Sequence, residues 1–374
     1  MPLTELIHLR KSLHRQPEVA FEEWNTAKQI LAFFNPLSPD RTITQLGGTG
    51  LAFIFKGKKQ GPRTLFRCEL DALPIFEKSD ADYKSQTEGK GHLCGHDGHM
   101  TIICGLGEKL AENRPESGEV VLLFQPAEET GQGAKAILAD PKFEAIRPDF
   151  AFALHNLPGF PLHQFVWKNG TIAAGSTGVT IKLTGKTAHA AHPEDGINPA
   201  AAIARLIDIL PNLPEQITGF ALVTLIHAEL GSLAFGTSAG EGSISATIRA
   251  FDQDELEQLI ALVEKAAQEQ AKKFGLKLEI SYQESFAVSK NEASLRELVL
   301  ESVNSLGLDI QEKQDPFRWS EDFGLFSQTC PAFFFGLGAG ERLPQLHEPS
   351  YDFPDELIET GVKVFEEVAR RING

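Results

Sequence analysis

Apolar side chains divide the first 156 residues into alternating helices and strands. In some segments they recur every three to four residues, and in others they form short continuous runs typical of buried strands. We expect helices at 4–16, 22–34, 98–114 and 133–138, and strands at 50–57, 63–74, 118–127 and 149–156. Alternation of this kind predicts an α/β fold with a mainly parallel sheet covered by helices.

The pattern changes after about residue 175. The next stretch reads strand, helix, strand, strand, helix, strand, an order that fits a small ferredoxin-like domain. A helix at 294–307 and a strongly apolar strand at 331–338 then return to the first pattern. A chain of 374 residues is also too long for one ordinary core. We therefore expect one domain formed by 1–175 and 286–374, with an α+β domain over 176–285 inserted into it.

Charge and apolar runs narrow the classes of partner. The formal net charge of -16 argues against a nucleic-acid or anionic-membrane partner. The apolar runs are shorter than the roughly 20 residues of a membrane helix, and the N-terminus lacks the apolar core of a signal peptide. The four cysteines show no paired framework, which suits reduced thiols. We expect a cytoplasmic protein.

The stretch GHLCGHDGHM, residues 91–100, concentrates metal-binding side chains in one predicted loop. Cys94 and His96 alternate with glycine, so a flexible backbone can turn both side chains toward one point. Thiolate and imidazole are good ligands for divalent ions. For this stretch alone an exposed polar turn is the alternative.

Further donors stand at the ends of other predicted strands. Glu128 and Glu129 follow the strand at 118–127, His155 ends the next strand, and His347 lies in the loop after the last one. Each alone could be a surface acid or a core histidine. Ligands of open sheets bind beyond the carboxyl ends of the strands, so the donors should meet on one rim.

The donors at the strand ends, added to Cys94 and His96, form a set of ligands too large for one tetrahedral metal site that keeps a water. The five candidate metal ligands are Cys94, His96, Glu129, His155 and His347. Such a set suits two metals sharing a bridging group. Glu128 could then take a proton from metal-bound water while its neighbour holds the metal.

Several segments resemble the binuclear metal amidohydrolases, which include hippurate hydrolase, N-acetyl amino acid deacetylases and plant auxin-conjugate hydrolases. In chain order from about Leu13 to Asp355 they are LHRQPEVAFEE, CELDALP, CGHDGHM, FQPAEETGQGAKAIL, LHNLPG, GKTAHAAHPEDGINPAAA, SEDF and FFFGLG. The resemblance implies the five ligands above, Glu128 as the general base, and a Cys94 thiolate able to bridge the ions. It also implies that 176–285 is a lid and dimerisation domain, with 1–175 and 286–374 as the catalytic domain.

The resemblance extends to three residues outside the ligand set. It implies that His189 stabilises the oxyanion, in some relatives across a subunit interface, and that Arg249 binds a substrate carboxylate. It implies that Asp71 orients a ligand imidazole by a hydrogen bond. The alternatives are a zinc pair of His189 with His192, an exposed strand charge for Arg249, and a turn or cap role for Asp71.

Departures from the family pattern and neighbouring histidines complete the expectations. The loop Gly236–Gly242 reads GTSAGEG where relatives read like NVIPDSA, and Glu69 stands where aspartate is commoner. We interpret the Glu69 change as minor because that position is not one of the five ligands. We expect His14 to be structural, and two further histidines, His92 and His99, to be neighbours of the site.

The function indicated is a metal-dependent amidohydrolase that cleaves the amide bond of an N-acyl amino acid through metal-activated water. Two divalent ions are expected, manganese or zinc first, with nickel or cobalt as alternatives. The partners expected are a small-molecule substrate and a second copy of the chain in a homodimer, with no nucleic acid and no membrane. The competing readings are an aminopeptidase or dipeptidase and an inactive metal-binding relative. The absence of a His-x-Asp ligand pair and the use of Cys94 disfavour the peptidase, and the presence of Glu128 beside Glu129 disfavours the inactive relative.

Overall fold

The computed structural model describes residues 2–374, which form two compact units. Unit 1 combines the chain up to Ile172 with Ser289–Pro316 and Asp322–Gly374, and unit 2 consists of Ala173–Val288 and Phe317–Glu321. The sequence assigns 317–321 to the first domain. In the structure this segment joins unit 2, because Phe317 forms a β-bridge with Ala173.

Unit 1 is built on an eight-stranded mixed sheet with the order β1-β2-β4-β3-β5-β16-β6-β15. The strands are β1 Arg41–Leu46, β2 Gly50–Lys56, β3 Lys59–Glu69, β4 Ser117–Gln125, β5 Phe150–Pro158, β6 Phe165–Trp167, β15 Ile310–Glu312 and β16 Ala332–Gly340. The central strands β4, β3, β5 and β16 run parallel, whereas β1, β2 and β6 are antiparallel to their inner neighbours. The predicted α/β fold with a mainly parallel sheet is confirmed.

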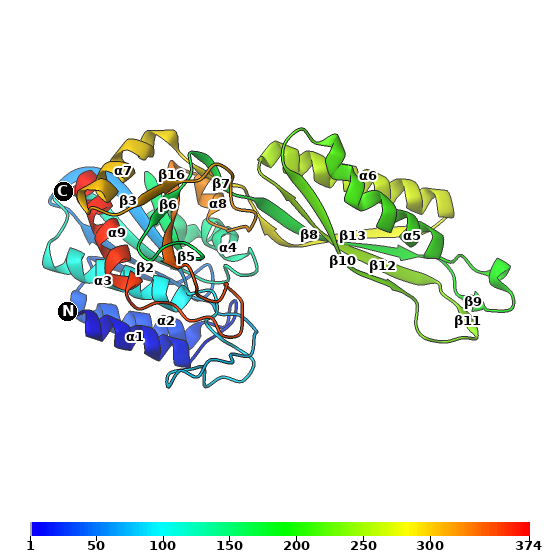
Figure 1. Ribbon diagram of the computed structural model, residues 1–374, viewed down its shortest axis with the longest axis horizontal. Coiled ribbons are helices and arrows are strands. Elements are labelled where there is room, and N and C mark those ends of the chain that lie inside the picture. The colour runs from blue at the N-terminus through cyan, green and yellow to red at the C-terminus, as the bar shows by residue number, and fades with distance from the viewer. Residues whose placement is uncertain (1) are drawn as a thin grey trace. The chain divides into compact units, whose positions relative to one another are not determined.

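The helices of unit 1 lie around this sheet in Figure 1, and those at 3–15, 24–34, 96–112, 296–305 and 357–373 share one apolar core with it. They are α1 Leu3–Arg15, α2 Trp24–Phe34, α3 His96–Glu112, α4 Gly133–Ala139, α7 Arg296–Ser305, α8 Gly324–Ser327 and α9 Leu357–Asn373, with 3-10 turns η1 Asn35–Leu37, η2 Pro141–Ala145 and η5 Ala293–Leu295. Phe66 of β3 shows how they pack, since its ring centroid lies 5.0 Å from that of Phe365 in α9 and 5.5 Å from that of Phe152 in β5. Among residues 2–374, no helix has both the length and the apolar character that a membrane crossing needs.

Unit 2 has the β-α-β-β-α-β order and the ferredoxin-like topology that the sequence predicts. Its elements are β8 Gly175–Thr184, α5 Ala200–Ile209, β10 Ala221–Leu230, β12 Glu241–Ala250, α6 Gln253–Phe274 and β13 Lys277–Phe286, which give an antiparallel sheet of order β10-β12-β8-β13. The sheet and both helices share a separate apolar core. Helix α6 begins where Asp252 accepts hydrogen bonds from the backbone N–H groups of Asp254 and Glu255, and it ends at Gly275 with a φ of 66°.

Short elements complete the chain. They are β7 Gly170–Ala173, β9 Ala188–His189, β11 Thr237–Ser238 and β14 Ser289–Asn291, with 3-10 turns η3 Pro193–Asp195 and η4 Leu210–Gln216. Strand β11 lies in the loop Gly236–Gly242 and pairs with β9, so that Thr237 stands opposite His189. The segment that departs from the family pattern therefore lies directly beside this histidine.

Candidate metal centre

The predicted ligands lie at the carboxyl ends of the parallel strands of unit 1. His155 belongs to β5, Glu128 and Glu129 follow β4, His347 follows β16, and Cys94 and His96 stand at the start of α3. Unit 1 therefore brings together all five residues named as ligands, together with the predicted base.

The glycine between the first two ligands gives their loop its shape. Gly95 has a φ of +94°, a left-handed conformation that other residues rarely adopt. Cys94 on one side is buried, with its Sγ 3.5 Å from Nε2 of His155. His96 on the other side is the first residue of α3 and is also buried.

The imidazole of His96 is oriented by one ring nitrogen and offers the other. Its Nδ1 lies 2.8 Å from the backbone carbonyl oxygen of Asp71. Its buried Nε2 has no hydrogen-bond partner among residues 2–374 and lies 3.9 Å from a carboxylate oxygen of both Glu128 and Glu129. A buried ring nitrogen facing two carboxylates at that separation fits a cation between them.

Glu129 connects this arrangement to the loop after β16. Its Oε2 is 3.6 Å from Nε2 of His347, and the His347 backbone N–H donates to the carbonyl of Leu93 at 2.8 Å. The donor atoms lie within 4.8 Å of one another in three groups, which are Cys94 with His96 and His155, Cys94 with Glu129 and His347, and His96 with Glu128 and Glu129. Groups that share members in this way suit two neighbouring ions.

The electrostatics of the cluster favour bound cations. Burial raises the pKa of the Cys94 thiol, and Glu129 raises it further, so a thiolate here requires a cation. Burial lowers the pKa of His96, but the carboxylates of Asp71 and Glu69 outweigh it and raise the pKa to about 10, so a metal ion bound there would displace the ring proton. Burial holds the pKa of His155 well below its usual range, which leaves the neutral imidazole that a metal ligand must be.

Asp71 lies beside the cluster, but the predicted side-chain hydrogen bond to an imidazole is not formed. The backbone carbonyl of Asp71 contacts His96, whereas its carboxylate lies 3.6 Å from that ring nitrogen. The carboxylate instead accepts the backbone N–H of Glu129 at 3.0 Å. Asp71 thus contacts two predicted ligands, the first through its main chain and the second through its side chain.

The other histidines of the segment are neighbours of the donor cluster. His99 contacts Glu69 and Asn156 through its two ring nitrogens, each at 2.6 Å. His92 is buried, and burial lowers its pKa to about 4. His14 is also buried, 2.8 Å from Asp97 and 3.2 Å from Glu77, consistent with a structural role.

Glu69 is more central than the sequence indicates. It is fully buried and forms an ion pair with Arg67 in addition to its contact with His99. The sequence interpretation of this position as minor considered only the five direct ligands, whereas the Glu69 carboxylate contacts His99, a neighbour of those ligands.

Sequence reasoning also missed Arg67 and Asp322. Arg67 is fully buried and forms an ion pair with Asp322, whose backbone N–H donates to Oε1 of Glu128 at 3.4 Å. The Asp322 carboxylate accepts from Gln125 and from the backbone of Ala134. An arginine in the apolar strand TLFRCEL was the available signal, since a buried charge requires a partner.

In unit 2, His189 is exposed, and its Nδ1 accepts the backbone N–H of Ala191 at 3.0 Å. Arg249 of β12 is partly buried and donates to the carbonyl of Arg318 and to the hydroxyl of Ser320, both at 3.0 Å. Arg249 is therefore held by hydrogen bonds within unit 2. The alternative of an exposed strand charge would leave its guanidinium in solvent.

A mainly parallel sheet with thiol, imidazole and carboxylate donors converging at its carboxyl edge defines the class as a metal-dependent hydrolase. The chain belongs to peptidase family M20/M25/M40, whose model matches residues 65–371. The resemblance to the binuclear metal amidohydrolases, and the prediction of a metal-dependent amidohydrolase, are confirmed.

Individual relatives match along nearly the whole chain. An N-acetyldiaminopimelate deacetylase of Pediococcus pentosaceus is 30% identical over 96% of this chain and 94% of its own length. An N-acetylcysteine deacetylase of Bacillus subtilis is 27% identical over 98% of this chain and 96% of its own length. A dinuclear metal-binding M20 peptidase of Bacillus subtilis is similar in structure, with a TM-score of 0.84, 25% identity, and coverage of 99% of this chain and 98% of its own.

Proposed function

We propose that the protein hydrolyses the amide bond of an N-acyl amino acid, releasing the acyl group as a carboxylate. The observation that carries this proposal is the convergence of five donors on one rim, with a second carboxylate, Glu128, beside the donor Glu129. The deacetylase names of two relatives support the N-acyl class of substrate.

Cys94, His96, Glu129, His155 and His347 would hold two divalent ions, manganese or zinc. When bound, such ions polarise an amide carbonyl and bring the pKa of water down toward about 7. The remaining chemistry belongs to the protein's own side chains.

Glu128 is suited to move the proton. Its carboxylate reaches 3.9 Å from Nε2 of His96, and its other oxygen accepts the backbone N–H of Asp322. In the proposed mechanism Glu128 takes a proton from the attacking water and delivers it to the leaving nitrogen. Its neighbour Glu129 stays in place because the Asp71 carboxylate holds its backbone N–H.

Two residues of unit 2 complete the proposed mechanism. The Nδ1 of His189 accepts a backbone N–H, so the neutral ring carries its proton on Nε2 and can donate it to the developing oxyanion. Arg249, held at 3.0 Å from two oxygen atoms, would bind the substrate carboxylate. We propose that unit 2 is the lid and dimerisation domain and that unit 1 carries catalysis.

We further propose a cytoplasmic homodimer that forms through unit 2. Strand β10 is an edge strand of its sheet and exposes Leu222, Ile226 and Leu230. An apolar sheet edge of this kind favours pairing with another copy. The four cysteines are free thiols, as expected in a reducing compartment.

The test is hydrolysis by purified protein reloaded with manganese or zinc. The substrates are N-acetyl and N-benzoyl amino acids, with free-amine dipeptides as the comparison. The proposal expects metal-dependent release of the acyl group from the N-acyl compounds. Cleavage of free-amine dipeptides alone would contradict it.

A further inference from the structure

Glu69 is a buried carboxylate that contacts charged or polar groups on both sides. It is the last residue of β3 and has no exposed surface. Its Oε1 pairs with Arg67, and its Oε2 lies 2.6 Å from Nδ1 of His99. Burial alone would raise the pKa of this carboxyl, but Arg67 and His99 hold it well below its usual range.

Arg67 is held by two further side chains, so the position of the Glu69 carboxylate is restricted. Its Nε donates to Oε1 of Gln125 in β4 at 3.0 Å, and its Nη2 pairs with Asp322. Gln125 in turn donates to the Asp322 carboxylate at 2.8 and 2.9 Å. All of these side chains are buried in unit 1, where a lost partner is costly.

His99 carries the contact from Glu69 to the predicted ligands. Its ring centroid lies 4.8 Å from that of His155 in an edge-to-face arrangement at 80°, and 5.6 Å from that of His96. Its Nε2 is 2.6 Å from Oδ1 of Asn156, the residue that follows His155. One ring thus contacts two ligand imidazoles and the strand that carries one of them.

Asn156 extends the contact to the loop of the other ligands. A Cβ added at Gly95 would lie 2.5 Å from Oδ1 of Asn156, so the amide rests against the backbone between Cys94 and His96. The amide nitrogen donates to the Tyr351 hydroxyl at 2.5 Å. Moving Asn156 would therefore disturb both segments that supply donors.

We propose that Glu69 is a positioning residue of the metal centre, acting through His99 and Asn156 on the segments that carry Cys94, His96 and His155. A buried ion pair adds little net stability by itself, so its contribution here is to hold the donors in place. The length of the glutamate side chain matters, because one carboxylate must reach Arg67 and His99 together. This inference rests on the part of the proposed function in which the cluster binds metal.

The test compares Glu69→Gln, which keeps the length and loses the charge, with Glu69→Asp, which keeps the charge and loses the reach. Affinity for manganese and zinc is measured on metal-free full-length protein by competition with a chromophoric chelator. Loss of a group that orients ligands typically costs about 10- to 100-fold in metal affinity, and we expect this range for both variants. Thermal unfolding of the metal-free proteins reports any general loss of structure.

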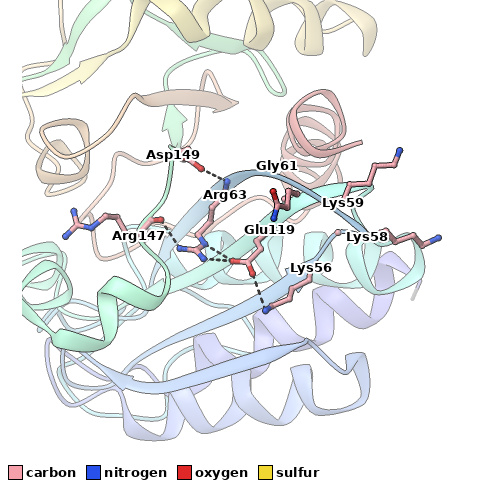
Figure 2. A pocket seen from close by; sticks show the side chains of 11 residues that line it. Lys56, Lys58, Lys59, Gly61, Arg63, Glu119, Arg147 and Asp149 are labelled. Carbon is pink, nitrogen blue, oxygen red and sulfur yellow. Dashed lines mark hydrogen bonds and ion pairs between the residues drawn. The ribbon is translucent and has the colours of Figure 1, made fainter.

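The matched control is Glu119→Gln. Glu119 is a glutamate of β4 that pairs with Arg63 at 2.6 Å and with Lys56 at 3.3 Å. Figure 2 shows Glu119 with Arg63 and Lys56 in a basic surface pocket. The pocket is lined by residues from the amino ends of β3 and β4, whereas Glu69 lies at the carboxyl end of β3. Its loss should leave metal affinity within about twofold of the original.

The proposal would be overturned if a folded Glu69→Gln protein kept a metal affinity within twofold of the original protein. It would also be overturned if Glu119→Gln lost as much metal affinity as Glu69→Gln. If Glu69→Gln does not fold, Glu69→Asp decides by the same criterion. The titration uses metal alone, so it separates the two proposals. An original protein that binds two ions but cleaves no N-acyl amino acid contradicts the proposed substrate and leaves this test valid.

Discussion

Replacing Gly95 with alanine tests how the loop between the two ligands is built. Two costs arise in the structure, because φ is +94° and the new Cβ would lie 2.5 Å from Oδ1 of Asn156. A left-handed conformation costs an L residue about 1–2 kcal/mol, and forcing a methyl group into a packed site costs about 1–3 kcal/mol. We expect Gly95→Ala to lower the free energy of unfolding by about 2–5 kcal/mol and to weaken metal binding.

Gly89 separates the two costs. It also has a positive φ, +73°, but an added Cβ would meet nothing within 4 Å. Gly89→Ala should therefore lose only about 1–2 kcal/mol and keep its metal affinity. Chemical denaturation of both metal-free variants and chelator competition provide the comparison. Equal losses of stability with equal metal affinity would refute the packing of Asn156 against the ligand loop.

Three further changes address separate parts of the account. Glu128→Gln should reduce turnover by about 10²- to 10⁴-fold while metal content, measured by mass spectrometry, stays the same; normal turnover would exclude Glu128 as the base. His189→Ala should reduce kcat by about 10²- to 10³-fold without loss of metal, and a change in KM alone would speak against oxyanion stabilisation. Ile226→Lys, at an exposed position of β10, should convert a dimer into monomers in sedimentation, whereas an unchanged sedimentation coefficient would place the interface elsewhere.

Strand ends and their donors could be predicted because their signals are local. A continuous apolar run such as that ending at Gln125 marks a buried strand, and the rule for parallel sheets then places Glu128 and Glu129 on the ligand-binding rim. The glycine between Cys94 and His96 indicated a loop with unusual dihedral angles, and Gly95 has a φ of +94°. The two-layer unit with β-α-β-β-α-β order followed from periodicity in the same way.

The supporting contacts could not be predicted, because they depend on pairs far apart in the chain. Arg67 meets Asp322, 255 positions later, and His99 meets Asn156, 57 positions later. Periodicity says nothing about such pairs. Asp71 shows a second limit, since the family resemblance implied a side-chain hydrogen bond to an imidazole, whereas the backbone carbonyl of Asp71 lies 2.8 Å from the His96 ring and the carboxylate lies 3.6 Å away.

The central claim is a two-metal centre that cleaves N-acyl amino acids, and one coupled measurement tests it most directly. Metal content of the purified protein is determined by mass spectrometry, and the same sample is assayed on N-acyl and free-amine substrates before and after chelation. The account predicts close to two ions per chain, with N-acyl cleavage that is lost on chelation and restored by manganese or zinc. A chain that holds no tightly bound metal and gains no activity from either ion would contradict it.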